Sequence, residues 1–193
     1  MLELEIPKGA PNEFLLASSR LASTPLRKEL AIKQIPSPES IAEFAIAFAA
    51  DVPDGKDSVM HRGVGSVVFL YDTEQNATWG SNFRVIAYAK SPIEADISEQ
   101  PDLPNYWWGN LRRTLDLNAA SYSHEAGTLT RTTSTGLGAL TVDEPYSEIE
   151  LRASWSPKQL DLSHHFLAWQ DLVASMAGYS LEAEIQTLRT KKA

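Results

Sequence analysis

Residues 146–178 constrain the fold more than any other part of the chain, because a strictly alternating segment passes directly into a helical one. In the first half Ile149, Leu151 and Trp155 share one parity and polar residues take the other, which is the period of a half-buried strand. In the second half apolar residues recur at helical spacing, with Ser163 as the expected N-cap and Gly178 as the expected stop. The pattern predicts a strand followed by a helix, each with one buried face.

The remaining elements are expected in the order α-βββ-α-ββ-α. Spacing predicts two more helices, one capped by Asn12 and ending before Pro25, the other running from about Leu103 to Asn118. Strands are expected at 40–52, 64–72, 78–90, 128–134 and 146–155. Helices segregated from strands with short links indicate the α+β class, with an antiparallel sheet of about five strands. This order is similar to that of the type III secretion chaperone-like fold, an analogy of order alone.

Two segments allow more than one interpretation. In residues 40–52 the side chains of Phe44, Ile46 and Phe48 alternate with alanine, although a helical stripe also fits them. We favour a strand because the aromatic and β-branched residues fall on one parity. Residues 26–35 are ambiguous, and a short edge strand ending at Pro36 is one solution.

Residues 64–72 are apolar on both parities, which predicts a central strand covered on both faces.

Composition limits the class of protein. A length of 193 residues suits one domain, expected at 12–180 with loosely ordered termini at 1–11 and 181–193. No apolar run approaches the roughly 18 residues of a membrane span, and the net charge of −8 argues against a nucleic-acid surface. The chain has no cysteine, which suits a cytoplasmic protein.

Motifs for catalysis or metal binding are weak. His164 and His165 are adjacent, so on a helix their side chains point about 100° apart and do not chelate one metal. The sequence has no Gly-x-Ser-x-Gly elbow, and its short glycine pairs do not form a phosphate-binding loop. Asp51, Asp54 and Asp57 lack the glycine position and distal glutamate of a calcium loop. We therefore expect no metal, no cofactor and no catalytic residue.

Two kinds of side chain remain as candidates for a binding surface. The five tryptophans are more typical of core than of a stacking platform, but Trp107 and Trp108 cannot share one helix face, so Trp108 is a candidate partner contact. Arginines on three expected strands, with glutamates and a threonine row nearby, would form a polar sheet face. These candidate residues are Arg84, Arg131, Arg152, Glu150 and Thr130, with Glu148, Thr128 and Thr132 beside them.

This polar face has two interpretations. It could be a solvated surface with cross-strand ion pairs, each of which contributes little to stability. It could also be a platform where arginines hold carboxylates of a ligand or peptide in bidentate fashion.

Residues 148–157, Glu-Ile-Glu-Leu-Arg-Ala-Ser-Trp-Ser-Pro, and 168–172, Ala-Trp-Gln-Asp-Leu, resemble a family of actinobacterial proteins known only as domain of unknown function 3000. Residues 34–38, 79–88 and 127–132 resemble it too, and the resemblance covers 12–180. It implies a cytoplasmic bacterial protein and brings no activity, cofactor or catalytic residue.

Because the catalytic and metal motifs are weak and a polar sheet face is expected, the sequence favours a non-enzymatic domain that binds a protein or peptide, as a chaperone or adaptor does. Homodimer formation stays open. The alternative is a small-molecule-binding domain or an enzyme whose site is the polar sheet face. A deep pocket among Arg84, Arg131 and Arg152 would favour the alternative, whereas a shallow face flanked by an apolar patch would favour protein binding.

Overall fold

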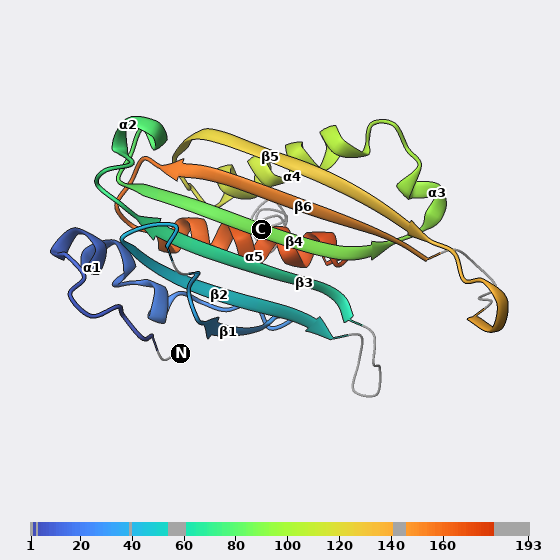
Figure 1. The fold of residues 1–193 in the computed structure, drawn as a ribbon, viewed down its shortest axis with the longest axis horizontal. Coiled ribbons are helices and arrows are strands. Elements are labelled where there is room, and N and C mark those ends of the chain that lie inside the picture. The colour runs from blue at the N-terminus through green and yellow to red at the C-terminus, as the bar shows by residue number, and fades with distance from the viewer. Residues whose placement is uncertain (1, 3, 39, 54–60, 141–145, 180–193) are drawn as a thin grey trace, which may run out of the picture.

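The computed structural model describes residues 2, 4–38, 40–53, 61–140 and 146–179, which form a six-stranded antiparallel sheet with helices on one face (Figure 1). The strand order is β1-β2-β3-β4-β6-β5. The strands are β1 Ala31–Ile35, β2 Phe44–Pro53, β3 His61–Tyr71, β4 Phe83–Ile93, β5 Tyr122–Ser134 and β6 Tyr146–Pro157. The helices are α1 Asn12–Ser18, α2 Asn76–Trp79, α3 Ala95–Ser98, α4 Leu103–Leu117 and α5 Ser163–Met176. The predicted α+β class is confirmed.

The sheet has six strands rather than about five, because the ambiguous segment before Pro36 forms β1. This strand pairs antiparallel with β2, from Ala31 opposite Asp51 to Ile35 opposite Ala47. It is an edge strand, as its short length and the following proline suggested. The prediction of a strand over 40–52 is confirmed, since β2 buries Ile46, Phe48, Ala50 and Val52 on one parity.

The core lies between the sheet and the helices α1, α4 and α5. Trp155 of β6 and the aromatic residues of α5 are its largest members; the ring centroids of Phe48 and Phe166 are 4.7 Å apart. Gly65 of β3 allows α5 to approach closely, because a Cβ atom there would lie 2.4 Å from Val173 Cγ2. Among the described residues, helices cover only this face of β3. On its other face Leu70 is buried and Val64 and Val68 are half-buried, so the expectation of two covered faces holds only in part.

The N-cap residue of helix α5 is Leu162 rather than the expected Ser163, and it makes no side-chain capping hydrogen bond. The Asp161 carboxylate accepts hydrogen bonds from the Ser163 backbone N–H at 3.0 Å and from its hydroxyl at 2.6 Å. Ser163 is therefore the first helical residue rather than the N-cap. The helix ends as predicted, with Gly178 in the left-handed region at φ 87°.

Three predicted boundaries are wrong. Trp79 lies in the short helix α2, which ends where Gly80 adopts φ 68°, so β4 begins at Phe83 rather than at residue 78. Helix α1 ends at Ser18, and a single 3-10 turn over Leu21–Ser23 completes the segment before Pro25. Strand β5 begins at Tyr122, before the threonine-rich run.

The first residues of the chain lie along β1. Leu2, Leu4 and Ile6 pack against the core. The Gln34 side-chain amide donates to Glu5 O and accepts from Glu5 N, both at 2.8 Å. Residues 181–193, expected to be loosely ordered, lie outside the described part of the chain. Among the described residues, no helix is long and apolar enough to cross a membrane.

Candidate functional site

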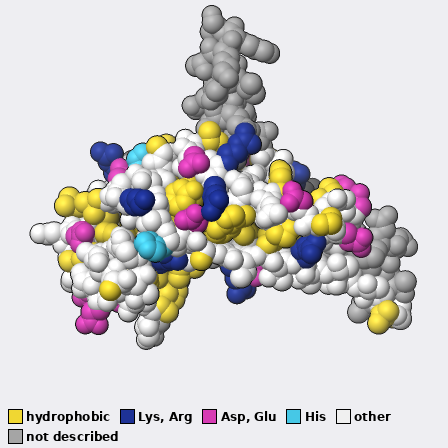
Figure 2. Space-filling model, turned by 90° about the horizontal axis from the view of Figure 1, so that it is seen from above, with side chains coloured by type: hydrophobic (Ala, Val, Ile, Leu, Met, Phe, Trp, Pro, Cys, Tyr) yellow, Lys and Arg dark blue, Asp and Glu magenta, His cyan; other side chains and the backbone are white. Residues whose placement is uncertain are grey.

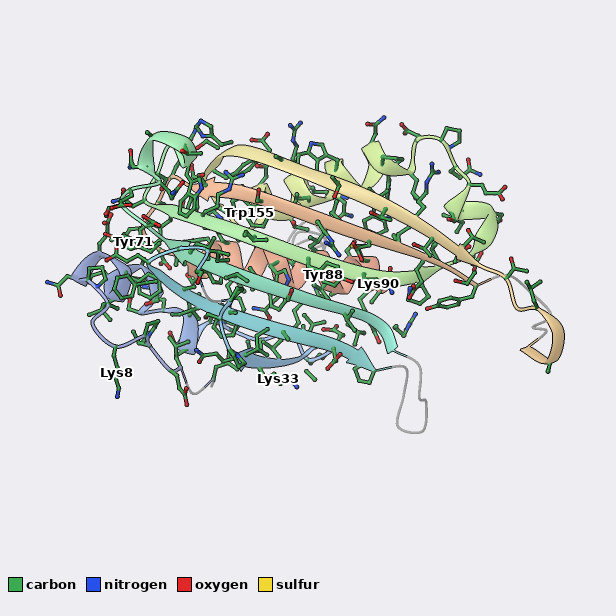
Figure 3. All side chains as sticks on the ribbon, in the orientation of Figure 1. Lys8, Lys33, Tyr71, Tyr88, Lys90 and Trp155 are labelled. Carbon is green, nitrogen blue, oxygen red and sulfur yellow. The ribbon has the colours of Figure 1, made fainter. Side chains whose placement is uncertain are left out.

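The candidate site is the open face, the sheet surface that points away from the helices. Its centre is formed by β4, β6 and β5, with Tyr88 opposite Arg152 and Arg152 opposite Thr128. In the next row Lys90 lies opposite Glu150, and Glu150 opposite Thr130. Figure 3 labels Tyr88 and Lys90 near the middle of this face. The open-face residues used below are Arg84, Ile86, Tyr88 and Lys90 of β4, Glu148, Glu150, Arg152 and Ser154 of β6, and Thr128, Thr130 and Thr132 of β5.

Charged groups on the open face pair with one another. The Glu150 carboxylate accepts from Arg152 Nε at 2.6 Å and from the Tyr88 hydroxyl at 3.2 Å. The Arg152 guanidinium also lies over the Tyr88 ring, 5.6 Å from its centroid. One row further, Lys90 Nζ is 2.6 Å from a Glu148 carboxylate oxygen. The face therefore presents two compensated ion pairs.

The two tyrosines at these pairs remain protonated donors. Burial raises the pKa of Tyr88 to about 12, with a further contribution from the charge of Glu150. Burial and the Glu148 carboxylate raise the pKa of Tyr146 in the same way, and its hydroxyl donates to Glu148 at 3.0 Å. A phenol with a raised pKa is a poor general base or nucleophile near neutral pH. This network is suited to binding rather than to proton transfer.

Arg84 has a different environment, because it bonds only to neutral groups. Its guanidinium donates to Ser154 Oγ at 2.6 Å, to Ser156 Oγ at 3.0 Å and to His124 O at 2.8 Å. His124 lies in a β-bulge of β5 with φ 53°, so Arg84 ties this irregular end of β5 to the sheet. Burial lowers the pKa of Arg84 from its ordinary value. No carboxylate of the described chain forms an ion pair with it.

Replacing Arg84 by alanine is expected to lower the free energy of unfolding by about 1–2 kcal/mol, because three charge-assisted hydrogen bonds to a partly buried group are lost. Arg152→Ala should cost less than about 1 kcal/mol, since that ion pair is largely exposed. Urea denaturation of the two variants measures both values. Equal, small losses would show that Arg84 is an ordinary surface cation.

The expectation that Arg131 shares this face is wrong. Arg131 pairs with Ile149, whose side chain is in the core, so it points to the helix side of β5. There its Nη1 donates to Ser98 O at 3.0 Å and to Gln100 O at 3.4 Å. The structure thus brings together Arg84, Arg152, Glu150 and Thr130 on one face, and it separates Arg131 from them.

Trp108 also lies on the helix side. Trp107 is buried and Trp108 is half-buried, as their adjacent helix positions required. Trp108 packs beside β5, where a Cβ on Gly127 would lie 2.8 Å from its Cζ3 atom. Next to it is a small cavity of about 190 Å³, which we call the Trp108 pocket. Its lining residues are Pro104, Asn105, Trp108, Gly127, Thr128, Leu129 and Leu151.

Sequence reasoning missed Tyr88, Lys90 and Tyr146 as members of the ion-pair network. The parity of β4 already contained the signal, because Arg84, Tyr88 and Lys90 are two and four residues apart. That Arg152 lies opposite Tyr88 could not be predicted, because it depends on the register between β4 and β6.

The two adjacent histidines have separate environments. His164 Nδ1 is 2.8 Å from Asn118 O, whereas His165 is fully buried and accepts from Trp155 Nε1 at 3.0 Å. Within the described chain, no group of three His, Asp or Glu side chains could hold a metal ion.

Comparisons with curated proteins and with solved structures found no match. A family model, described as a protein of unknown function and named DUF3000, matches residues 10–185. This match includes every strand of the sheet, the open face and helix α5. The chain belongs to the DUF3000 family of proteins of unknown function.

Proposed function

We propose that this chain is a non-enzymatic cytoplasmic domain that binds a protein or peptide, as a chaperone or adaptor does, through its open face. The observation that supports the proposal is the shape and chemistry of that face. Within the described part of the chain it is a sheet surface without a helix over it (Figure 1). It joins a polar network on β4, β6 and β5 to apolar residues on β3 and β4. These apolar residues are Val68 and Ile86, which lie opposite each other, and Val64, which lies opposite Lys90; Ile86 is 39% exposed.

The ion pairs suit exchange with a partner. Arg152 is largely exposed, so a partner carboxylate can replace Glu150 as its acceptor at a small cost in desolvation. An apolar side chain from the partner would cover Ile86 at the same time. Surfaces of this kind fit an extended or flat protein segment better than a small ligand.

The small-molecule alternative requires a deep pocket at the arginines. A groove of about 720 Å³ lies elsewhere, between the first residues of the chain and β1, and neither Arg84 nor Arg152 lines it. Its lining combines aliphatic side chains, such as Leu4 and Ile32, with the polar side chains of Glu5, Lys33 and Gln34. The analogy with secretion chaperones gives no support, because it rested on the order α-βββ-α-ββ-α, whereas four strands precede α4 in the structure.

Affinity capture from the native host tests the proposal. Ile86→Gln and Arg152→Ala alter the open face, and Leu117→Gln on α4 is a matched control because Leu117 is also 39% exposed. We expect the wild type and Leu117→Gln to retain the same partner and the two open-face variants to lose it. Thermal melts confirm that each variant is folded.

If both open-face variants retain every partner that the wild type retains, the open face is not the binding surface and the proposal fails.

A further inference from the structure

Strand β5 is a long edge strand whose outer side pairs with no described strand. It has 13 residues, whereas the opposite edge strand, β1, has 5 and lies beside the first residues of the chain. Proteins usually protect sheet edges with lysine, proline or a very short strand. The residues of β5 include neither lysine nor proline, and its bulge lies at one end, between Ser123 and Ala126.

The ladder shows which main-chain groups of β5 face outward. Lys158 N donates to Ser121 O, so even-numbered residues of the adjoining strand β6 direct their N–H and C=O groups toward β5. Thr128, Thr130 and Thr132 lie opposite even-numbered β6 residues and take up those bonds. It follows that Leu129, Arg131 and Thr133 direct their N–H and C=O groups away from the sheet.

The Trp108 pocket lies directly beneath this free edge. Gly127, Thr128 and Leu129 of β5 form one wall, and Trp108 and Pro104 of α4 form the other. A strand added to β5 would direct every second side chain toward the helix side, over this pocket. Main-chain pairing with a side-chain pocket beneath is how domains recognise extended peptides by strand addition.

Two arginines, Arg112 and Arg131, lie on the helix side of this edge, although the net charge of the chain is −8. Arg112 lies over the Trp108 ring at 5.7 Å and pairs with Glu125 at 2.9 Å. Arg131 has carbonyl acceptors and no described carboxylate partner. Figure 2, viewed from above, shows basic, acidic and hydrophobic side chains interspersed over the middle of this surface.

We propose that the β5 edge binds an extended segment of a partner protein as a seventh strand. An aliphatic side chain of the segment enters the Trp108 pocket, and an acidic residue next to it on the same side binds Arg131. This assignment rests on the proposed protein- or peptide-binding function and adds the recognition mode and the chemistry of the partner.

Selection of short linear peptides from a random phage-displayed library, with the full chain as bait, supplies the probes. Enriched peptides are expected to alternate, with aliphatic and acidic residues on one parity. Their Kd is then measured by fluorescence polarisation against Arg131→Ala and Arg131→Pro. Both variants lack the guanidinium, but only proline removes the outward N–H, so Arg131→Pro should bind about tenfold more weakly than Arg131→Ala.

A second variant tests the pocket independently. Asn105→Phe fills the Trp108 pocket from its exposed rim without replacing any residue of β5, so it should weaken the same peptides by a similar factor. It also covers the case in which Arg131→Pro fails to fold, which thermal melts would reveal.

Four outcomes overturn the assignment. The first is a selection that enriches no peptide. In the second, the peptides bind Arg131→Pro as tightly as Arg131→Ala, and they bind Asn105→Phe as tightly as the wild type. The third is a wild-type dimer in sedimentation that Arg131→Pro dissociates, since a second copy would then occupy the edge. Peptides that lose affinity with Ile86→Gln but not with Arg131→Pro would refute the edge site and leave the open-face proposal standing.

Discussion

Trp155→Ala is expected to lower the free energy of unfolding by about 3–5 kcal/mol, as for other large aromatic residues deleted from a core. Trp155 is fully buried in β6, opposite Val85 of the central strand β4. Its Nε1 donates to His165 Nδ1 at 3.0 Å, so the substitution also leaves a buried acceptor without its donor. Urea denaturation with a common slope measures the loss.

Tyr106→Ala is the control for deletion of an aromatic side chain. Tyr106 is 60% exposed on α4, so its loss should change stability by less than about 1 kcal/mol. If Trp155→Ala unfolds at the same urea concentration as Tyr106→Ala, the inward parity of β6 is incorrect and the account of the core fails.

Stability is expected to fall by about 3 kcal/mol between pH 6.5 and pH 4 because of His165 alone. Burial lowers the pKa of His165 from 6.5 to about 4; the neighbouring charge of His164 lowers it further and Asp161 opposes this. The geometry supports the direction, because Nδ1 accepts from Trp155 and a second proton would face that N–H group. His165 Nε2 has no partner among the described residues that could stabilise the cation.

The sign follows from proton binding by the two states. Below pH 6.5 His165 binds a proton in the unfolded chain, whereas in the folded chain it binds this proton only near pH 4. Stability from this residue is therefore complete above pH 6.5 and is lost as the pH falls to about 4. Urea denaturation across this range should show a flatter profile for His165→Gln than for the wild type. His164→Gln is the control and should keep most of the slope, because burial is the main cause of the lowered pKa of His165. An unchanged slope in His165→Gln would contradict the account.

The face of most strand residues could be predicted from parity alone. Ile149, Leu151 and Trp155 are buried as expected, and Phe83, Val85 and Ala87 form the inner face of β4. Successive side chains of a strand point to opposite faces, so their parity can be predicted without knowing which strands lie beside it. The same rule, applied consistently, would have separated Arg131 from Thr130, which is the next residue in the strand.

The rest of the candidate site depends on contacts between distant residues. Which strand neighbours β6 decides that Arg152 meets Tyr88, 64 residues earlier in the chain, and nothing local in the sequence specifies that pairing. Trp79 has strong strand propensity, yet Gly80 and a hydrogen bond from Ser156 to Trp79 O hold it in a short helix. The free edge of β5 became visible only with the strand order.

The central claim is that the sheet, through its open face and the β5 edge, is the surface that meets a partner. Amide hydrogen exchange of the wild-type chain, with and without its captured partner, tests this most directly. The account predicts slower exchange in β4, β6 and β5, strongest at Leu129, Arg131 and Thr133, whose N–H groups face outward. Unchanged exchange in these strands, with protection confined to the exposed surfaces of α4 and α5, would contradict it.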